Sequence, residues 1–342
     1  MHAKQRRLAP LALTALFGLT TGSAGAAAQG QTYHLSGEIA GPDYRWDYLS
    51  VDTAARRIYV GRQGGVTAID LDTAKVTPTL LAGGIVHGVI PIGRADEAIA
   101  ADGAADRLTL FNGATGEVIA QIPVGKGPDA LVLEPVTGEV LAFNAQSQDA
   151  SVVDVRSRKV VATIPLGGRP EFPAADGKGL VFDNITDKAE IAVIDARARK
   201  VVRRFPLRRC QEPTGLAYDA ATGLLVSVCD NGLAKVVDAG TGEEVASLAV
   251  GKGADAVILD AERRLAFVPS GGDGTLSVIS LRSRNAVRVV QVVKTKLGVR
   301  TGAVDPRTGT LYLPSADYLA PKSAGQRPPV APGSFKYLVV AP

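Results

Sequence analysis

Residues 127–168 read GPDALVLEPVTGEVLAFNAQSQDASVVDVRSRKVVATIPLGG and contain four short runs of apolar and β-branched residues in succession. Polar turns such as PVTGE separate the runs, and each run is too short for a helix, which is typical of β-strands. The second run returns elsewhere as RRIYVGR at 56–62, GLLVSVC at 223–229 and GTLYLPS at 309–315. The four-strand unit is therefore a repeat.

Equivalent positions in the first strand of each unit give the number of repeats. They are separated by 41, 41, 42, 43, 41 and 45 residues. A unit of about 40 residues with four short strands is the pattern of a propeller blade. The sequence therefore predicts an all-β fold, a seven-bladed β-propeller of four-stranded antiparallel blades. The equivalent positions are Tyr48, Val89, Ala130, Phe172, Gly215, Ala256 and Thr301.

The last repeat shows how the ring closes. It contains three strands, near 301–304, 310–314 and 335–340, and lacks a fourth. The segment TYHLSGEIAG at 32–41 resembles the fourth strands of other repeats, so we expect residues 32–40 to pair with the last blade, which removes an open sheet edge. A Pro-rich insertion at 315–334 is either a functional lid or a spacer. The predicted blades are 42–80, 81–123, 124–166, 167–208, 209–250, 251–293 and 296–342.

The N-terminus is typical of a secretory signal peptide. Lys4, Arg6 and Arg7 precede the apolar stretch 8–19, and small residues at 26–28 fit a cleavage site. We expect residues 1–28 to be removed, leaving residues 29–342 as a single propeller domain in the periplasm or outside the cell. The apolar stretch is too short for a membrane span.

Removing that segment changes the charge balance. The chain has 38 Lys and Arg against 34 Asp and Glu, and residues 1–28 hold three of the basic residues and no acidic residue. The rest therefore has 35 (38 − 3) against 34, a net charge near +1. Single-stranded nucleic acids bind in basic, aromatic-lined grooves, so nucleic acid is a disfavoured partner. We expect a monomer whose partner is a small polar ligand or another envelope protein.

The motifs resemble a known repeat family. RRIYVGR at 56–62 and ATIPLGGRP at 162–170 are similar to the YVTN-type β-propeller repeat. The stretches 210–232, 250–260, 271–278 and 300–318 are similar to exported bacterial YncE-like proteins. The resemblance covers nearly all of the chain after the signal segment and implies a periplasmic or cell-surface propeller. It implies little chemistry, because one propeller scaffold hosts many activities.

The candidate site follows from the repeat alignment. In a propeller the first strand of each blade lines the central channel, so the residue just before each first strand and the loop between the second and third strands lie at the channel mouth. Several of these residues are carboxylates, whose oxygens suit a cation or a polar ligand. The alternative is that loop Asp and Asn residues cap turns. The ligand-binding candidates are Trp46, Asp47, Arg62, His87, Asp129, Glu171, Asn184, Thr214, Asp255 and Arg300.

Three functions are compatible with this mouth. The first is a non-catalytic propeller that binds a small ligand, an ion or a partner protein, because the sequence lacks P-loop, HExxH and GxSxG motifs. The second is a lactonase-like metal-dependent hydrolase using Asp129, Glu171, Asn184 and Asp255. The third is binding of single-stranded nucleic acid. A divalent cation is the possible cofactor, although one histidine falls short of a usual zinc site; its candidate ligands are Asp47, His87, Asp129, Glu171 and Asp255.

The chain has two cysteines, Cys210 and Cys229. They are placed just before the first strand and at the end of the second strand of one repeat, so antiparallel pairing brings them together. An exported protein meets an oxidising environment. The sequence therefore predicts a structural disulfide. The alternative, a redox-active or metal-binding pair, lacks the CxxC spacing.

Overall fold

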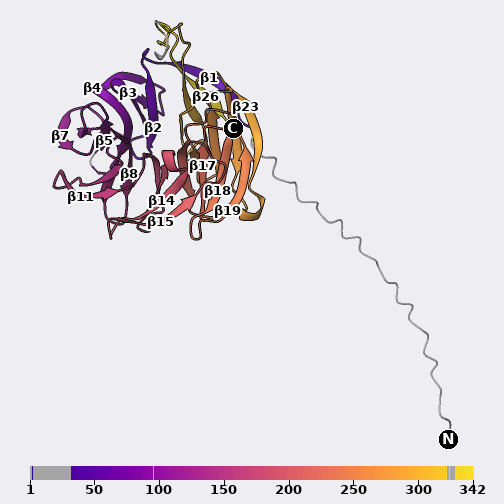
Figure 1. Ribbon diagram of the computed structural model, residues 1–342. Helices are drawn as coiled ribbons and strands as arrows, with labels where there is room; N and C mark the ends of the chain where they lie inside the picture. Colours follow the sequence, from indigo (N-terminus) through magenta and orange to yellow (C-terminus); the bar gives the residue numbers. More distant parts are fainter. Residues whose placement is uncertain (1, 3–31, 95, 322, 324–327) are drawn as a thin grey trace. The chain divides into compact units, whose positions relative to one another are not determined.

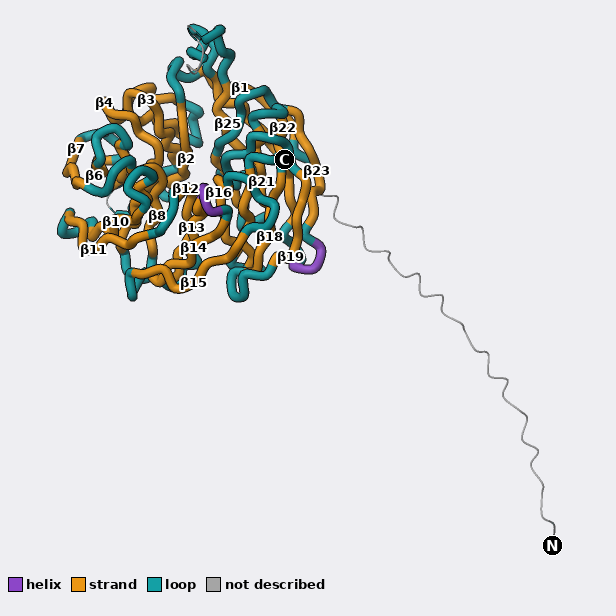
Figure 2. The backbone as a smooth tube through the Cα atoms, in the orientation of Figure 1, coloured by secondary structure: helices purple, strands orange, loops and turns teal. Residues whose placement is uncertain are grey.

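The computed structural model describes residue 2 and residues 32–94, 96–321, 323 and 328–342. The predicted signal peptide, apart from its second residue, lies outside the described residues. These described residues form 26 β-strands and two single-turn 3₁₀ helices, Thr186–Lys188 and Arg284–Ala286 (Figure 1, Figure 2). Within this part of the chain, no helix is long and apolar enough to cross a membrane.

Five sheets have four antiparallel strands each, with each strand hydrogen-bonded to the next. In four of these sheets the strands follow one another in sequence order, with the first strand nearest the centre of the ring and the last strand farthest from it (Figure 1). Their bounds are β8 Pro128–Glu134, β9 Glu139–Asn144, β10 Asp149–Asp154 and β11 Lys159–Pro165; β12 Pro170–Ala175, β13 Leu180–Ile185, β14 Glu190–Asp195 and β15 Lys200–Pro206; β16 Pro213–Asp219, β17 Leu224–Cys229, β18 Leu233–Asp238 and β19 Glu244–Ala249; β20 Ile258–Asp260, β21 Leu265–Ser270, β22 Thr275–Ser280 and β23 Arg288–Lys294.

The fifth four-stranded sheet closes the ring. Its order is β1-β26-β25-β24, so the first described strand pairs with the last. The strands are β1 His34–Ala40, β24 Ala303–Val304, β25 Leu311–Ser315 and β26 Lys336–Ala341. The antiparallel pairing extends from His34 opposite Ala341 to Ala40 opposite Lys336. The predicted closing strand, residues 32–40, is therefore confirmed.

The prediction of seven four-stranded blades is wrong, because the strands form six sheets, the sixth of which has six strands in the order β2-β3-β4-β5-β6-β7. The predicted boundary between residues 80 and 81 lies inside β4, a strand of 16 residues. The first half of β3 pairs with β2 and its second half with β4, which continues to pair with β5. The bounds are β2 Trp46–Asp52, β3 Arg57–Asp70, β4 Val76–Pro91, β5 Glu97–Asp102, β6 Arg107–Asn112 and β7 Val118–Pro123.

Glycine pairs explain why the chain continues where a break was expected. Gly64 and Gly65 have φ of 92° and 127°, and Gly83 and Gly84 have φ of 102° and 77°. Glycine adopts such values without a steric penalty, so β3 and β4 bend through bulges rather than ending. The register indeed shifts between Gln63 and Gly65. One continuous sheet results where the repeat pattern predicted two blades.

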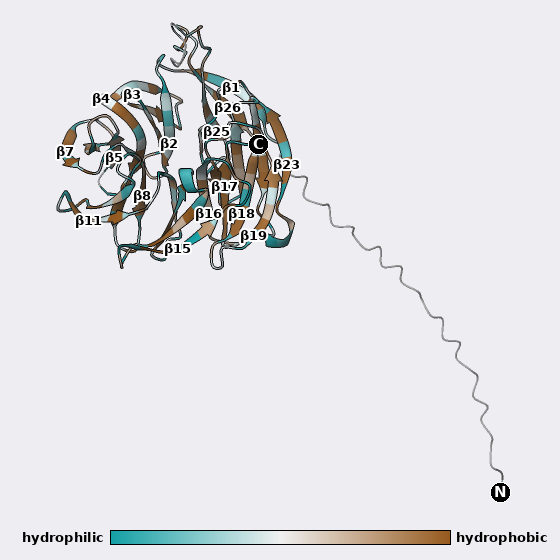
Figure 3. Ribbon diagram, viewed as in Figure 1, coloured by the Kyte–Doolittle hydropathy of each residue, from teal (hydrophilic) through white to brown (hydrophobic). Residues whose placement is uncertain are grey.

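The core lies between neighbouring sheets. Strand residues such as Val226 and Val236 pack against Ala266 and Val268 of the next sheet, and apolar colouring follows strands such as β4 and β23 (Figure 3). The inner strands touch in succession around the ring: β2 with β4, β4 with β8, β8 with β12, β12 with β16, β16 with β20, β20 with β24 and β24 with β2. This circle brings the N-terminal ends of the inner strands, and in β4 the interior residue His87, to one mouth.

A disulfide joins Cys210 and Cys229, as the sequence predicted. Their Cα atoms are 5.4 Å apart, and Pro213 of β16 pairs with Cys229 of β17 beside the bond. Both cysteines are buried in a cluster with Phe182, Phe205 and other apolar residues. The bond therefore ties the entry loop of this sheet to its second strand next to the mouth.

Candidate functional site

The mouth of the ring holds a pocket of about 440 Å³. Six carboxylates line it, against three basic side chains, His87, Arg169 and Arg300. Glu212 and Asp230 were not among the predicted candidates. The structure brings seven of the ten predicted candidates together in this lining: Asp47, His87, Asp129, Glu171, Thr214, Asp255 and Arg300.

The acidic residues of the loops are used differently from those of the mouth. In the loops, Asp106 accepts a hydrogen bond from the Gly127 amide at 2.8 Å, and Asp187 accepts one from the Arg169 amide at 2.7 Å. Asp273 accepts one from the Lys252 amide at 2.8 Å. These carboxylates stabilise turns, as the alternative interpretation of the loop residues predicted. The carboxylates at or just before the start of the inner strands instead line the pocket, and the loop residue Asp230 joins them.

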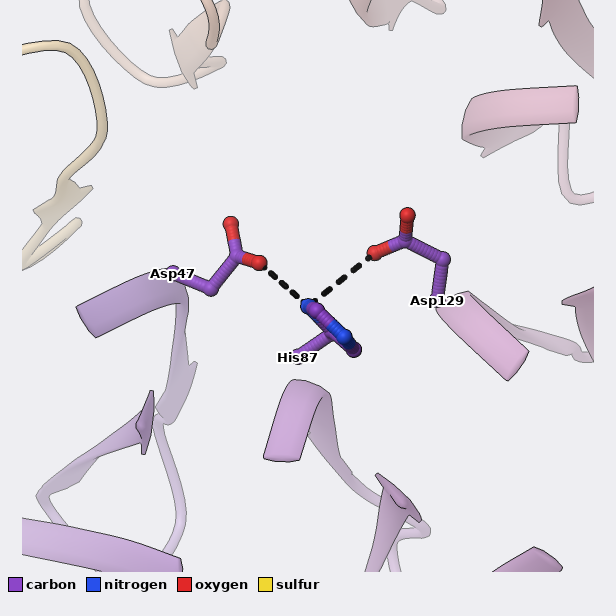
Figure 4. Close-up of side chains that lie close together, drawn as sticks. All are labelled: Asp47, His87 and Asp129. Atoms are coloured by element: carbon purple, nitrogen blue, oxygen red, sulfur yellow. Dashed lines mark hydrogen bonds and ion pairs between the residues drawn. The ribbon is translucent and has the colours of Figure 1, made fainter. Parts of the chain in front are cut away.

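His87 lies between two of these carboxylates (Figure 4). Its Nδ1 is 2.5 Å from Asp47 Oδ2 and 3.7 Å from Asp129 Oδ1. Burial opposes protonation of His87, but the hydrogen bond to Asp47 and the charges of Asp129 and Asp47 raise its pKa to about 9. At neutral pH the imidazole is therefore positively charged, and Nδ1–H donates to Asp47. Gly103 makes room for the ring, because a Cβ there would lie 2.6 Å from His87 Cδ2.

Three further mouth carboxylates, Asp129, Glu171 and Asp255, resist ionisation. Burial, together with the charges of Asp47 and Glu171, raises the pKa of Asp129 to about 7. Burial and the charge of Asp255 raise the pKa of Glu171 to about 7. Burial raises the pKa of Asp255 to about 6, although Arg300, at 2.9 Å, opposes the shift. The mouth therefore has a deficit of positive charge, which a cation entering the pocket would relieve.

Asp47, His87 and Asp129 are also the described residues whose donor atoms could together hold a metal, since all lie within 4.8 Å of one another. Their arrangement fits a proton better than an ion. Zinc binds nitrogen and carboxylate oxygen at about 2.0–2.2 Å and usually needs three or four protein ligands. The 2.5 Å contact between His87 and Asp47 leaves no room for an ion between the two atoms. Glu171 and Asp255 do not belong to this group. These residues therefore do not support a metal-dependent step.

Two predicted candidates have structural roles instead. Asn184 is fully buried; its amide donates to the carbonyls of Thr214 at 2.6 Å and Gly215 at 3.1 Å. It accepts from Ser227 at 3.0 Å and does not line the pocket. Arg62 is 3% exposed and lies in a second pocket beside the first. Only three of the four residues considered for a hydrolase therefore reach the mouth.

Trp46 lines that second pocket, which has a volume of about 220 Å³. The ring is buried and stacks on Tyr318 with the ring centroids 6.4 Å apart. Tyr318 comes from the insertion at 315–334, and the repeat pattern contains nothing that would place it over Trp46. The sequence offered one sign that Tyr318 packs against another residue: it is the one aromatic residue in an otherwise Pro-rich insertion.

Raised carboxyl pKa values make the stability of the fold depend on pH. Asp129 titrates near 3.9 when unfolded and at about 7 when folded, so its buried charge destabilises the fold increasingly between these pH values. We expect Asp129→Asn to match the wild-type protein at pH 4 and to exceed its free energy of unfolding at pH 8 by up to about 4 kcal/mol, because each pKa unit corresponds to about 1.4 kcal/mol. Urea unfolding at the two pH values measures this difference. An equal difference at both pH values would mean that Asp129 is ionised normally.

No protein-family model matches the chain, and no curated protein matches it. Among solved structures, hydrazine synthase of Kuenenia stuttgartiensis is similar, with a TM-score of 0.69 and 14% sequence identity. The match covers 84% of this chain and 96% of that chain. At this identity the likeness shows the fold alone. The comparisons thus support a β-propeller fold and assign no family.

Proposed function

We propose that this protein is a binding protein whose mouth pocket takes a small cationic ligand. The observation that carries the proposal is the excess of six carboxylates over three basic groups in one pocket of about 440 Å³. Opposite charges favour association and set its specificity. The same acidity disfavours a nucleic-acid partner.

Cellular location and family belong to the proposal as well. The repeat motifs support a place among YVTN-type, YncE-like propellers. The N-terminal pattern supports export to the periplasm or beyond, and the disulfide suits an oxidising compartment. In that setting the protein would meet its ligand outside the cytoplasm.

The fluorescence of Trp46 tests the proposal directly, because it is the only tryptophan in the chain and its pocket shares Asp47, His87 and Arg300 with the mouth. We expect titration with ethylammonium to change the emission in a saturable way. Propionate, an anion of similar size, should produce no saturable change. Saturable binding of propionate alone would contradict the proposal.

Carboxamide variants locate the binding. We expect Asp129→Asn and Glu171→Gln each to weaken ethylammonium binding at least about tenfold, which corresponds to 1.4 kcal/mol. Glu117→Gln is the matched control: Glu117 is exposed in the turn between β6 and β7, at the opposite end of the strands. Unchanged affinity in both mouth variants would exclude this pocket as the site.

A further inference from the structure

The second pocket, beside the mouth, has a charge opposite to that of the mouth. The two pockets share three charged side chains, those of Asp47, His87 and Arg300. The charged side chains that line the second pocket alone are both basic, Arg45 and Arg62. Those that line the mouth alone are one arginine and the mouth carboxylates other than Asp47. An acidic pocket and a basic pocket therefore lie side by side.

The shared residues form the boundary between the two pockets. His87 and Asp47 largely neutralise each other, because His87 Nδ1 lies 2.5 Å from Asp47 Oδ2 (Figure 4). Arg300 contacts Asp255 through Nε at 2.9 Å, and its side chain is 45% exposed. Among the described residues, the two terminal nitrogens of Arg300 have no partner. Arg300 can therefore bind an anionic group that lies on the second-pocket side of the boundary.

Arg62 carries a buried charge that the fold does not neutralise. The residue is 3% exposed, and burial lowers its pKa. Its guanidinium donates four hydrogen bonds of 2.7–3.0 Å, to the hydroxyls of Thr67 and Thr79 and to the carbonyls of Gln63 and Pro78. All four acceptors are uncharged, and no carboxylate of the described chain forms an ion pair with Arg62. A buried charge without a counter-ion is unfavourable, and an anion in the second pocket would offset it.

We propose that the two pockets together bind a zwitterion, a small molecule whose ammonium group lies in the mouth and whose carboxylate lies in the second pocket, beside Arg300 and near Arg62. The planar guanidinium fork matches the geometry of a carboxylate. The inference rests on the proposed cation-binding function and deepens it by naming the chemical class of the ligand. A simple cation leaves the basic pocket without a counter-charge, and a simple anion is repelled by the mouth carboxylates.

A homologous series of ligands tests the inference by isothermal titration calorimetry. The zwitterions are the ω-amino acids from 3-aminopropanoate to 6-aminohexanoate, a series in which the chain length sets the distance between the two charges. Each is compared with the alkylammonium ion and the alkanoate that have the same number of carbons. We expect the best ω-amino acid to bind at least about tenfold more tightly than its alkylammonium ion. The alkanoates should not bind measurably.

Two arginine variants assign the carboxylate to the second pocket. Arg300→Gln should lower the preference for the ω-amino acid over its alkylammonium ion about tenfold. The alkylammonium ion itself should bind this variant at least as tightly as the wild-type protein, because the mouth loses a positive charge. Circular dichroism checks that the variant is folded.

Arg169→Gln is the matched control, because Arg169 lines the mouth alone and its side chain is 53% exposed beside Glu171, at 3.5 Å. This variant also removes one positive charge from the mouth. It should therefore strengthen the binding of both ligands and leave the preference between them unchanged. An equal loss of preference in both variants would overturn the placement of the carboxylate in the second pocket.

The remaining outcomes distinguish this inference from the proposed function. If no ω-amino acid bound more tightly than its alkylammonium ion, the zwitterion would be overturned and cation binding would stand. Binding of neither class would overturn both proposals. Tighter binding of the alkanoates than of the ω-amino acids would also overturn both.

Discussion

Replacing Tyr33 with alanine is expected to lower the free energy of unfolding by about 3–5 kcal/mol, the usual range for removing a large buried aromatic ring. Tyr33 is 1% exposed and packs edge-on against Phe267 with the ring centroids 4.8 Å apart. It belongs to a cluster that also contains Leu338 and Val340 of β26. The residue therefore anchors the closing strand β1 to two sheets at once.

The backbone at Tyr33 adds a second attachment. Its amide donates to Gln291 Oε1 at 3.0 Å, and Gln291 Nε2 donates back to the Tyr33 carbonyl at 2.7 Å. These bonds survive the alanine substitution, so the loss measured is that of the ring. Guanidinium chloride unfolding gives the free energy, and faster unfolding should accompany it, since opening the closed ring exposes sheet edges.

Tyr33→Phe is the control for this prediction. The Tyr33 hydroxyl is buried and has no hydrogen-bond partner among the described residues. Removing it should therefore leave stability unchanged or increase it. If Tyr33→Ala behaved like Tyr33→Phe, the closing strand would contribute little to the fold, and ring closure through Tyr33 would be refuted.

Reduction of the disulfide is expected to lower the free energy of unfolding by about 3 kcal/mol. Cys210 and Cys229 are 19 residues apart, and cross-linking a loop of this length restricts the unfolded chain by about that free energy. The chain has no other cysteine, so a thiol reductant acts on this bond alone. Unfolding of oxidised and reduced protein in guanidinium chloride measures the difference.

The double variant Cys210→Ala/Cys229→Ala separates the bond from the reductant. It should resemble the reduced protein, and adding reductant should change it no further. A midpoint equal to that of the oxidised wild-type protein would show that the disulfide does not stabilise this sheet.

The repeat pattern predicted most strands well because, apart from β3 and β4, each strand is short, apolar and bounded by polar turns. It also predicted the closing strand, because residues 32–40 resemble the fourth strands that the last repeat lacks. It failed where glycine changed the backbone: Gly64 and Gly65 let β3 continue through a predicted loop. Sequence alone does not distinguish a glycine that ends a strand from one that bends it.

The sequence predicted a mouth residue correctly wherever the repeat alignment placed the inner strand beside it in the right register. Asp47, Asp129 and Glu171 reach the pocket because each is the second residue of an inner strand, one position from where the repeat alignment placed it. Arg62 and Asn184 were chosen because the repeat alignment places them at the loops between second and third strands, and the alignment does not reveal that backbone carbonyls already occupy their donors. The contact between Trp46 and Tyr318 joins segments with no shared repeat position, so it emerges only in three dimensions.

Proton release on cation binding tests the central claim most directly. Asp129 and Glu171 have pKa values of about 7, so each is partly protonated at pH 7. A bound cation favours the ionised carboxylates and lowers these pKa values, which expels protons. Calorimetric titration with ethylammonium at pH 7 in phosphate and in HEPES, whose ionisation enthalpies differ, should give different binding heats. The difference should correspond to the release of up to about one proton per bound cation. Absence of binding, or binding with proton uptake, would contradict a cation site built on these carboxylates.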